Sequence, residues 1–327
     1  MTVRVIYNGE MGAHPLKEVL GRTIRQLADG NKKIIYLDAD LMSCICMREW
    51  AEKNPDRGIN CGIAEANMIG IAAGLSAVGF QPLVHTFCAF ASRRCYDQVF
   101  LSCGYAQNSI TVIGSDPGVC AAFNGGTHTA FEDMALYRAI PGSTVIDISD
   151  ENQLISALIQ TGGKKGLTYI RTPRKSAAKL YGDYSHMPVG KGILLREGKD
   201  AAVFACGIMV CEAMKAAEQL EREGIFVSVI DMFTVKPLDE ECLLRHAKAS
   251  GLVVTAENHN KIGGLYSAVT EVLAEKLPVP VECVAAEDCF GEVGPQEYLQ
   301  EKFGLNSNEI VKKVKRGLER RTKRSQK

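Results

Sequence analysis

One carboxylate stands in an otherwise apolar, glycine-rich segment, and it has the clearest chemical potential in the chain. The segment Asn60-Cys-Gly-Ile-Ala-Glu-Ala-Asn-Met68 places Glu65 in the first turn of an expected helix. A helix dipole favours a negative charge at this end, so capping alone could account for the carboxylate. A carboxylate partly withdrawn from water could instead share a proton with a bound group. Glu65 alone leaves both interpretations open.

Two further segments carry aromatic rings and an imidazole after expected strands. His85-Thr-Phe-Cys-Ala-Phe90 places two phenylalanines three residues apart, a spacing that core packing could also produce. Asn124-Gly-Gly-Thr-His128 is a polar, flexible turn that ends in a histidine, which can bind or transfer a proton near neutral pH. Neither segment identifies a reaction by itself.

The elements that must position these groups alternate between strand and helix, which predicts mostly parallel sheets covered on both faces. The pattern lapses at 172–188, where we expect a linker. The sequence therefore predicts two doubly wound α/β domains, residues 1–185 and 186–327, with ligands at the carboxyl ends of their strands. Expected strands are 33–37, 81–85, 109–113, 144–148, 168–171, 201–205, 226–230, 252–256 and 281–284, and expected helices are 64–78, 91–103, 129–139, 210–223, 239–249 and 264–276.

Composition excludes several classes of protein. Lys plus Arg and Asp plus Glu both total 38 of 327 residues, so no net charge favours nucleic acid or a membrane surface. The basic tail from Lys312 could be a binding arm, but a solvated helix end is the favoured interpretation. The longest apolar stretch is interrupted by glycines and the N-terminal apolar run is short, so we expect a cytoplasmic protein. The 12 cysteines lack zinc-binding spacing, and no metal site is predicted.

Taken in order along the chain, several motifs together resemble the transketolase family. The resemblance covers nearly the whole chain, in two groups of motifs. Those similar to the pyrimidine-binding domain are Asp38-Ala-Asp40-Leu41, Gly62-Ile-Ala-Glu-Ala-Asn-Met68, Thr86-Phe-x-x-Phe90, Gly125-x-Thr-His128 and Tyr169-Ile-Arg171, and those similar to the C-terminal domain are Glu257-Asn-His-Asn-Lys-Ile-Gly-Gly264 and Phe290-Gly-Glu-Val-Gly294.

This resemblance implies a thiamine diphosphate cofactor whose pyrimidine end is bound by this chain. Glu65 would hydrogen-bond N1′ of the aminopyrimidine and stabilise its imino tautomer. Phe87 and Phe90 would pack on the ring, with Phe90 as the stacking partner, an arrangement that contributes about 0.5–1.5 kcal/mol beyond burial. Asp40 and Ile63, in the matching motifs, are further cofactor-binding candidates.

The metal-binding Gly-Asp-Gly motif of the family has no counterpart here. The Gly-Asp pair Gly182-Asp183 is followed by Tyr184, in the expected linker. Mg²⁺ needs carboxylate and carbonyl oxygens plus phosphate, so the diphosphate must be held elsewhere. We therefore expect an N-terminal partner subunit that binds Mg²⁺ and the diphosphate, and an α₂β₂ heterotetramer in which this chain is β.

Three positions depart from the family's substrate contacts. Asp116 replaces a histidine that binds phosphate, Asn124 replaces an aspartate that recognises a hydroxyl, and Lys17 replaces an arginine. A carboxylate near a phosphate is repulsive by about 1 kcal/mol or more. By resemblance, His128 would bind the two-carbon unit and Arg171 the substrate's anionic end. We expect two-carbon ketol transfer from an unusual ketose, for example sulfonated, branched or atypically phosphorylated, to an aldose phosphate.

Two alternatives stay open at this point. A 2-oxoacid dehydrogenase β subunit or a deoxyxylulose phosphate synthase-like enzyme would share the architecture, and Tyr96-Asp-Gln98 and Ser149-Asp-Glu-Asn152 have echoes there. A non-catalytic assembly subunit could also keep the fold. The retention of Glu65 together with both phenylalanines argues against such a subunit.

Overall fold

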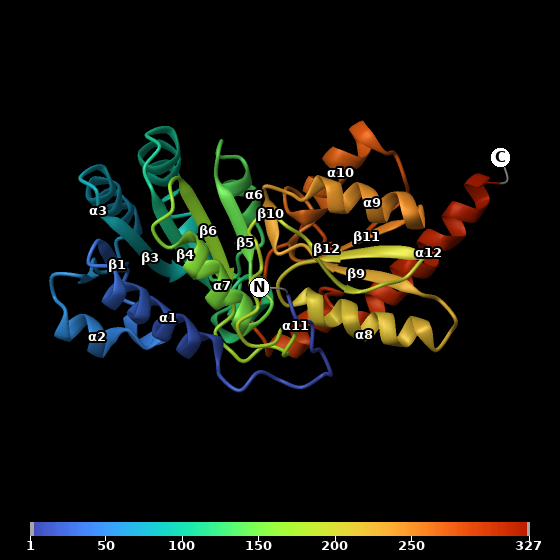
Figure 1. The fold of residues 1–327 in the computed structure, drawn as a ribbon, viewed down its shortest axis with the longest axis horizontal. Helices are drawn as coiled ribbons and strands as arrows, with labels where there is room; N and C mark the ends of the chain where they lie inside the picture. The colour runs from blue at the N-terminus through green and yellow to red at the C-terminus, as the bar shows by residue number, and fades with distance from the viewer. Residues whose placement is uncertain (1–2, 326–327) are drawn as a thin grey trace.

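The computed structural model describes residues 3–325. These residues form two mostly parallel β-sheets, each flanked by helices (Figure 1). Figure 1 shows them side by side, with the N-terminal half on one side and the C-terminal half on the other. The predicted α/β class with two mostly parallel sheets is confirmed. No helix in this part of the chain is long and apolar enough to cross a membrane.

The first sheet has seven strands in the order β10-β5-β6-β4-β3-β1-β2. Its central strands are buried along almost their whole length, as expected for parallel strands covered on both faces. The edge strand β10 comes from the second half of the chain and pairs antiparallel with β5. The bounds are β1 (Ile34–Asp38), β2 (Gly58–Asn60), β3 (Gln81–Phe87), β4 (Ile110–Ser115), β5 (Thr144–Asp147), β6 (Leu167–Thr172) and β10 (Thr234–Lys236).

Helices cover both faces of this sheet, because alternate residues of each strand point to opposite sides. Ile34 and Tyr36 pack in one apolar cluster with α1 and α7, while Ile35 and Leu37 pack in another with α3. The helices are α1 (Leu16–Gly30), η1 (Met42–Ile45), α2 (Arg48–Lys53), α3 (Glu65–Ala77), α4 (Cys88–Ser92), α5 (Tyr96–Gln98), η2 (Val99–Tyr105), η3 (Gly118–Asn124), α6 (Asp133–Arg138) and α7 (Glu151–Thr161).

The second sheet has the order β12-β11-β8-β9-β7, all parallel except β7, which pairs antiparallel with β9. Its strands are β7 (Ile193–Arg196), β8 (Ala201–Ala205), β9 (Val227–Asp231), β11 (Val253–Asn260) and β12 (Val281–Ala286). Its helices are α8 (Met209–Glu221), α9 (Glu240–Ser250), α10 (Leu265–Lys276), α11 (Gln296–Lys302) and α12 (Ser307–Ser325).

Two elements differ from the expected pattern. The expected helix 91–103 is divided into α4, α5 and the π-helix η2, because Cys95 leaves the helical conformation with φ −136° and ψ 17°. The basic tail forms α12, which lies along the second sheet (Figure 1). Arg316 and Arg320 of this helix pair with the buried Glu282 of β12, so these cations have a structural role.

A buried ion-pair network joins the two halves. The Arg171 guanidinium contacts Asp133 at 2.8 Å and Asp147 at 3.0 Å, and it donates to the backbone oxygen of Asn258 at 3.1 Å. Asn258, from β11, accepts from the backbone N–H of Val119 at 3.0 Å. We call these residues (Arg171, Asp133, Asp147 and Asn258) the interdomain network.

Candidate functional site

The expected cofactor side chains converge at the carboxyl edge of the first sheet. Glu65 lies at the start of α3 and is only 4% exposed. Phe87 ends β3, and its ring centroid lies 5.9 Å from that of Phe90 in α4. The His128 ring lies 5.0 Å from Phe90 and 5.9 Å from Phe87. The sheet therefore brings together a carboxylate, two aromatic rings and an imidazole from distant segments.

A residue that the sequence reasoning missed, Arg94, completes this group. Its guanidinium donates to the Glu65 carboxylate at 2.8 Å and lies 3.7 Å from the centre of the Phe90 ring. A carboxylate withdrawn from water needs such a partner. The non-helical turn at Cys95 lies directly after Arg94, and this turn was not visible as a break in the apolar periodicity.

The Glu65 carboxylate and the Phe90 face together offer a hydrogen-bond acceptor beside an aromatic surface. In the structure a planar, hydrogen-bonding guanidinium already makes both contacts. An aminopyrimidine ring is also planar and nitrogen-rich, so the residues present fit the pyrimidine end of thiamine diphosphate. This donor set is therefore chemically suited to the cofactor head that the sequence predicted.

The His128 imidazole lies beside the two phenylalanine rings and is oriented by a hydrogen bond. Its Nδ1 lies 2.9 Å from the Thr127 hydroxyl, in the turn that follows η3. Partial burial lowers the pKa of His128, and Arg94 and Arg93 act in the same direction. The imidazole is therefore neutral at pH 7, with one nitrogen able to donate and the other able to accept.

A cleft of about 510 Å³ lies beside these rings. Three of the predicted substrate residues, Lys17, Asp116 and Asn124, line it. The Asp116 Oδ2 contacts Arg174 at 2.5 Å, and the Arg174 guanidinium lies 5.0 Å from the Phe87 ring centre. Arg174 thus lies between the cleft and the Phe87 ring.

The expected role of Arg171 does not fit its position. Its side chain is 0% exposed, and its guanidinium is engaged by the interdomain network. A substrate anion could not reach it without breaking these contacts. Arg174, three residues later and 28% exposed in its side chain, is the arginine that lines the cleft. The β6 strand carries Arg171 inside the sheet and ends at Thr172, so only Arg174 emerges at the edge.

Asp40 and Ile63 lie at the same edge but outside the cluster of rings. Asp40 follows β1 with φ 63° and accepts from the Asn60 amide at 3.0 Å, while Ile63 is 75% exposed. Their cofactor contacts stay a prediction. Behind them, the buried Asp38 binds His85 at 2.7 Å, which fixes the ends of β1 and β3 relative to each other.

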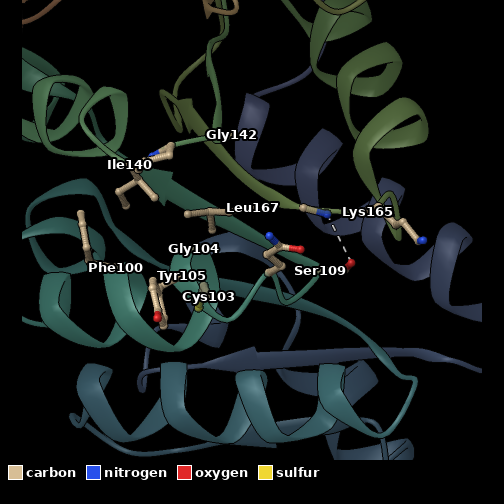
Figure 2. Close-up of a pocket in the computed structure, with 12 residues that line it drawn as sticks. Phe100, Cys103, Gly104, Tyr105, Ser109, Ile140, Gly142, Lys165 and Leu167 are labelled. Atoms are coloured by element: carbon tan, nitrogen blue, oxygen red, sulfur yellow. Dashed lines mark hydrogen bonds between the residues drawn. The ribbon is translucent and has the colours of Figure 1, made fainter.

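Metal-ligating groups are not gathered at this edge. Within residues 3–325, no group of three or more His, Cys, Asp or Glu side chains is arranged to hold a metal ion. A second hollow, of about 720 Å³, lies at the opposite, amino end of the sheet. Figure 2 shows Phe100, Tyr105, Ile140 and Leu167 in its lining, so much of its surface is apolar.

Two family models match the chain, and together they span most of it. "Transketolase, pyrimidine binding domain" matches residues 14–179, and "Transketolase, C-terminal domain" matches residues 190–310.

Curated relatives of two lengths match the chain. The 6-deoxy-6-sulfo-D-fructose transketolase subunit SqwH of Clostridium sp. (strain MSTE9) is 47% identical, over 94% of this chain and 96% of its own length. Transketolase-like protein 2 of Mus musculus is 32% identical over 96% of this chain but only 50% of its own length. For 1-deoxy-D-xylulose-5-phosphate synthase 1 of Geobacter sulfurreducens the identity is 35%, over 92% of this chain and 47% of that protein.

A solved structure described as "Split gene transketolase, inactive beta4 tetramer" superposes with a TM-score of 0.86. Its sequence is 37% identical, and the match covers 94% of this chain and 99% of that one. The likeness therefore extends over both sheets and their relative arrangement.

Proposed function

The chain belongs to the transketolase family as a C-terminal subunit, and we propose that it forms the pyrimidine-binding half of a split, thiamine diphosphate-dependent enzyme. The observation that carries this proposal is the group formed by Glu65, Phe90 and His128 at the carboxyl edge of the first sheet. Relatives that match over only half of their own length show that a longer chain can carry this module as one part.

The roles of the chain's own residues follow from this geometry. Glu65 holds and returns a proton at N1′ of the aminopyrimidine, and its burial keeps water from competing for that proton. Phe87 and Phe90 enclose the ring, and neutral His128 orients a hydroxyl of the ketose. When bound, thiamine diphosphate supplies the thiazolium carbon that attacks the ketose carbonyl.

The described residues supply no metal site, and this supports a partner that binds Mg²⁺ and the diphosphate. The partner would be an N-terminal subunit, and the assembly an α₂β₂ heterotetramer, with each active site at an α–β interface. The beta-only tetramer among the similar structures is described as inactive, as expected of a subunit family that needs a second chain.

The donor we propose is a sulfonated ketose. A relative that is 47% identical is named for 6-deoxy-6-sulfo-D-fructose, and the cleft of this chain contains the cation Arg174 for an anionic group. An aldose phosphate would accept the two-carbon unit. Compared with synthesis of deoxyxylulose phosphate, ketol transfer is favoured because the relative with the higher identity and nearly full coverage is a transketolase subunit.

The test co-expresses this chain with an N-terminal subunit that carries a diphosphate-binding domain and assays the reconstituted complex. The complex is supplied with thiamine diphosphate, Mg²⁺, an aldose phosphate and either 6-deoxy-6-sulfofructose, fructose 6-phosphate or pyruvate. We expect the sulfonated ketose to be shortened by two carbons. Decarboxylation of pyruvate, with no ketose consumed, would contradict the proposal.

A further inference from the structure

The Arg174–Asp116 pair has a geometry that bears on which anion the cleft accepts. Both the Nε and Nη2 atoms of Arg174 contact the same carboxylate oxygen, Oδ2, at 2.7 Å and 2.5 Å. An arginine carries five N–H donors, so this pairing leaves others for a ligand. The cleft therefore keeps an arginine for binding but places a negative charge directly against it.

Asp116 is fixed in this position by the backbone. It follows β4 with φ 56°, a conformation that only aspartate, asparagine and a few other non-glycine residues adopt readily. Its N–H donates to the Thr172 oxygen at 3.1 Å, and the residue is 5% exposed. Two N–H groups of Arg174 hold this carboxylate in place, so an anion that reaches the arginine lies next to a negative charge and is repelled by it.

The other groups around Arg174 are two cations and a thiol. Lys17 and Lys175 line the same cleft, and the Cys44 thiol lies within hydrogen-bonding reach of Arg174. A thiol is a weak donor compared with a hydroxyl or a backbone N–H. It offers little to the strong acceptor oxygens of a doubly charged phosphate. His128 lies across the Phe87 ring, and the Cys120 thiol also lines the cleft.

A sulfonate and a phosphate monoester differ in charge more than in shape. The phosphate carries about −1.5 to −2 at pH 7 with a second pKa near 6. A sulfonate carries a single charge throughout this range, and its oxygens are weaker acceptors. Coulomb repulsion from a fixed carboxylate scales with the ligand's charge, so the dianion is penalised about twice as much.

We infer that Asp116 is a specificity-determining residue that shifts the preference of the Arg174 cleft from a doubly charged phosphate toward a singly charged sulfonate at the same end of the ketose. This inference rests on the proposed function, because it assumes that the cleft holds the donor's anionic end. It adds a physical device that weakens the binding of a doubly charged phosphate relative to that of a sulfonate.

The test compares wild type with Asp116→Asn in the assembled complex. Asparagine keeps the size and tolerates the positive φ, while it removes the charge. The probes are 6-deoxy-6-sulfofructose and fructose 6-phosphate, which share a carbon skeleton. We expect the ratio of kcat/KM for sulfonate over phosphate to fall about ten-fold in Asp116→Asn at pH 7.5. Asp29→Asn, an exposed carboxylate on α1, is the matched charge control and should leave the ratio unchanged.

A second readout uses pH, because protonation near pH 6 makes the phosphate singly charged. For wild type we expect the ratio to fall several-fold between pH 7.5 and 5.5, and for Asp116→Asn we expect a much smaller change. A role of Asp116 in folding alone would not produce this difference. A ratio within two-fold of wild type in Asp116→Asn at both pH values would overturn the inference.

Calorimetric titration of the complex with the same two probes, without acceptor, measures their binding. This measurement separates the proposed function from the role of Asp116. If neither ketose is turned over, the proposed function fails. The binding ratio then still decides the role of Asp116, since the same ten-fold shift or its absence is measured without chemistry.

Discussion

Both sheets carry polar side chains at the carboxyl ends of their strands, yet the two edges use them in opposite ways. At the first sheet, His128 and Arg174 are partly exposed beside a cleft. At the second sheet, Glu257, Asn258 and His259 are at most 1% exposed and are enclosed by the first domain and α10. Strand ends attract polar residues in both places, but only the first edge leaves room for a ligand.

The partners of the second edge show what its residues do instead. Glu257 accepts the backbone N–H groups of Leu265 at 2.7 Å and Tyr266 at 2.8 Å, which satisfies the first turn of α10. Burial raises the pKa of Glu257 to about 7 and lowers that of His259 to about 4. Strongly shifted pKa values therefore occur at the buried contact between the two domains as they would at a catalytic centre. Exposure to solvent distinguishes the two kinds of site.

Removing the Glu65 carboxylate at the carboxyl edge of the first sheet, which we call the open edge, should give the largest effect. We expect Glu65→Gln to lower kcat of the assembled enzyme about 10²–10⁴-fold, because an amide cannot hold and return the proton at the pyrimidine. The thermal midpoint should stay close to that of wild type, since the amide can still accept from Arg94. Steady-state rates with saturating cofactor and thermal unfolding measure the two quantities. Activity within ten-fold of wild type would remove Glu65 from the chemistry.

The two arginines of β6 and its following loop form a matched pair. Arg171→Met leaves Asp133 and Asp147 as uncompensated buried carboxylates, and we expect it to reduce the free energy of unfolding by about 3–5 kcal/mol. Arg174→Met leaves one buried carboxylate, Asp116, without its partner, which is itself 28% exposed, and should cost less, about 1–3 kcal/mol, while it weakens donor binding. Urea denaturation and KM for the donor test both. Equal losses of stability in the two variants would contradict the distinction between the buried interdomain network and the cleft.

The buried Glu257 should make stability depend on pH. Its pKa is raised from 4.5 to about 7 in the folded protein, so the native state binds a proton that the unfolded chain releases. Its contribution to stability is complete below about pH 4.5 and is lost as the pH rises through about 7. Glu257→Gln should remove this dependence, up to about 3 kcal/mol between pH 5 and 8. Urea midpoints across that range are the measurement, and parallel curves for the two proteins would refute the prediction.

The smallest effect is expected from Arg94, which occupies the open edge. Its side chain is 45% exposed but Glu65 is 4% exposed, so loss of this pair leaves a buried carboxylate and should reduce the free energy of unfolding by about 1–3 kcal/mol. Because the guanidinium covers the face of Phe90, Arg94→Met should tighten cofactor binding a few-fold. Calorimetric titration of the complex with thiamine diphosphate tests this. Weaker binding would show that Arg94 assists the cofactor instead of competing with it.

The sequence predicted the α/β architecture because strand and helix periodicities are local, and the observed β8 coincides with the predicted 201–205. It did not predict α1, although Leu16, Leu20 and Ile24 repeat with helical spacing. Resemblance located Glu65 and the phenylalanines that cluster with His128. It could not separate Arg171 from Arg174, since both are arginines at a strand end and only burial distinguishes them. Arg94 was equally hidden, because its contact depends on a turn rather than on spacing.

The central claim is that the open edge is half of an active site that a second subunit completes. The most direct test titrates the N-terminal subunit into a fixed amount of this chain, with thiamine diphosphate, Mg²⁺, the sulfonated ketose and an aldose phosphate present. We predict no two-carbon transfer by either chain alone and a rate that rises to a plateau at a one-to-one ratio. Full activity of this chain alone, or none at any ratio while the complex forms, would contradict the account.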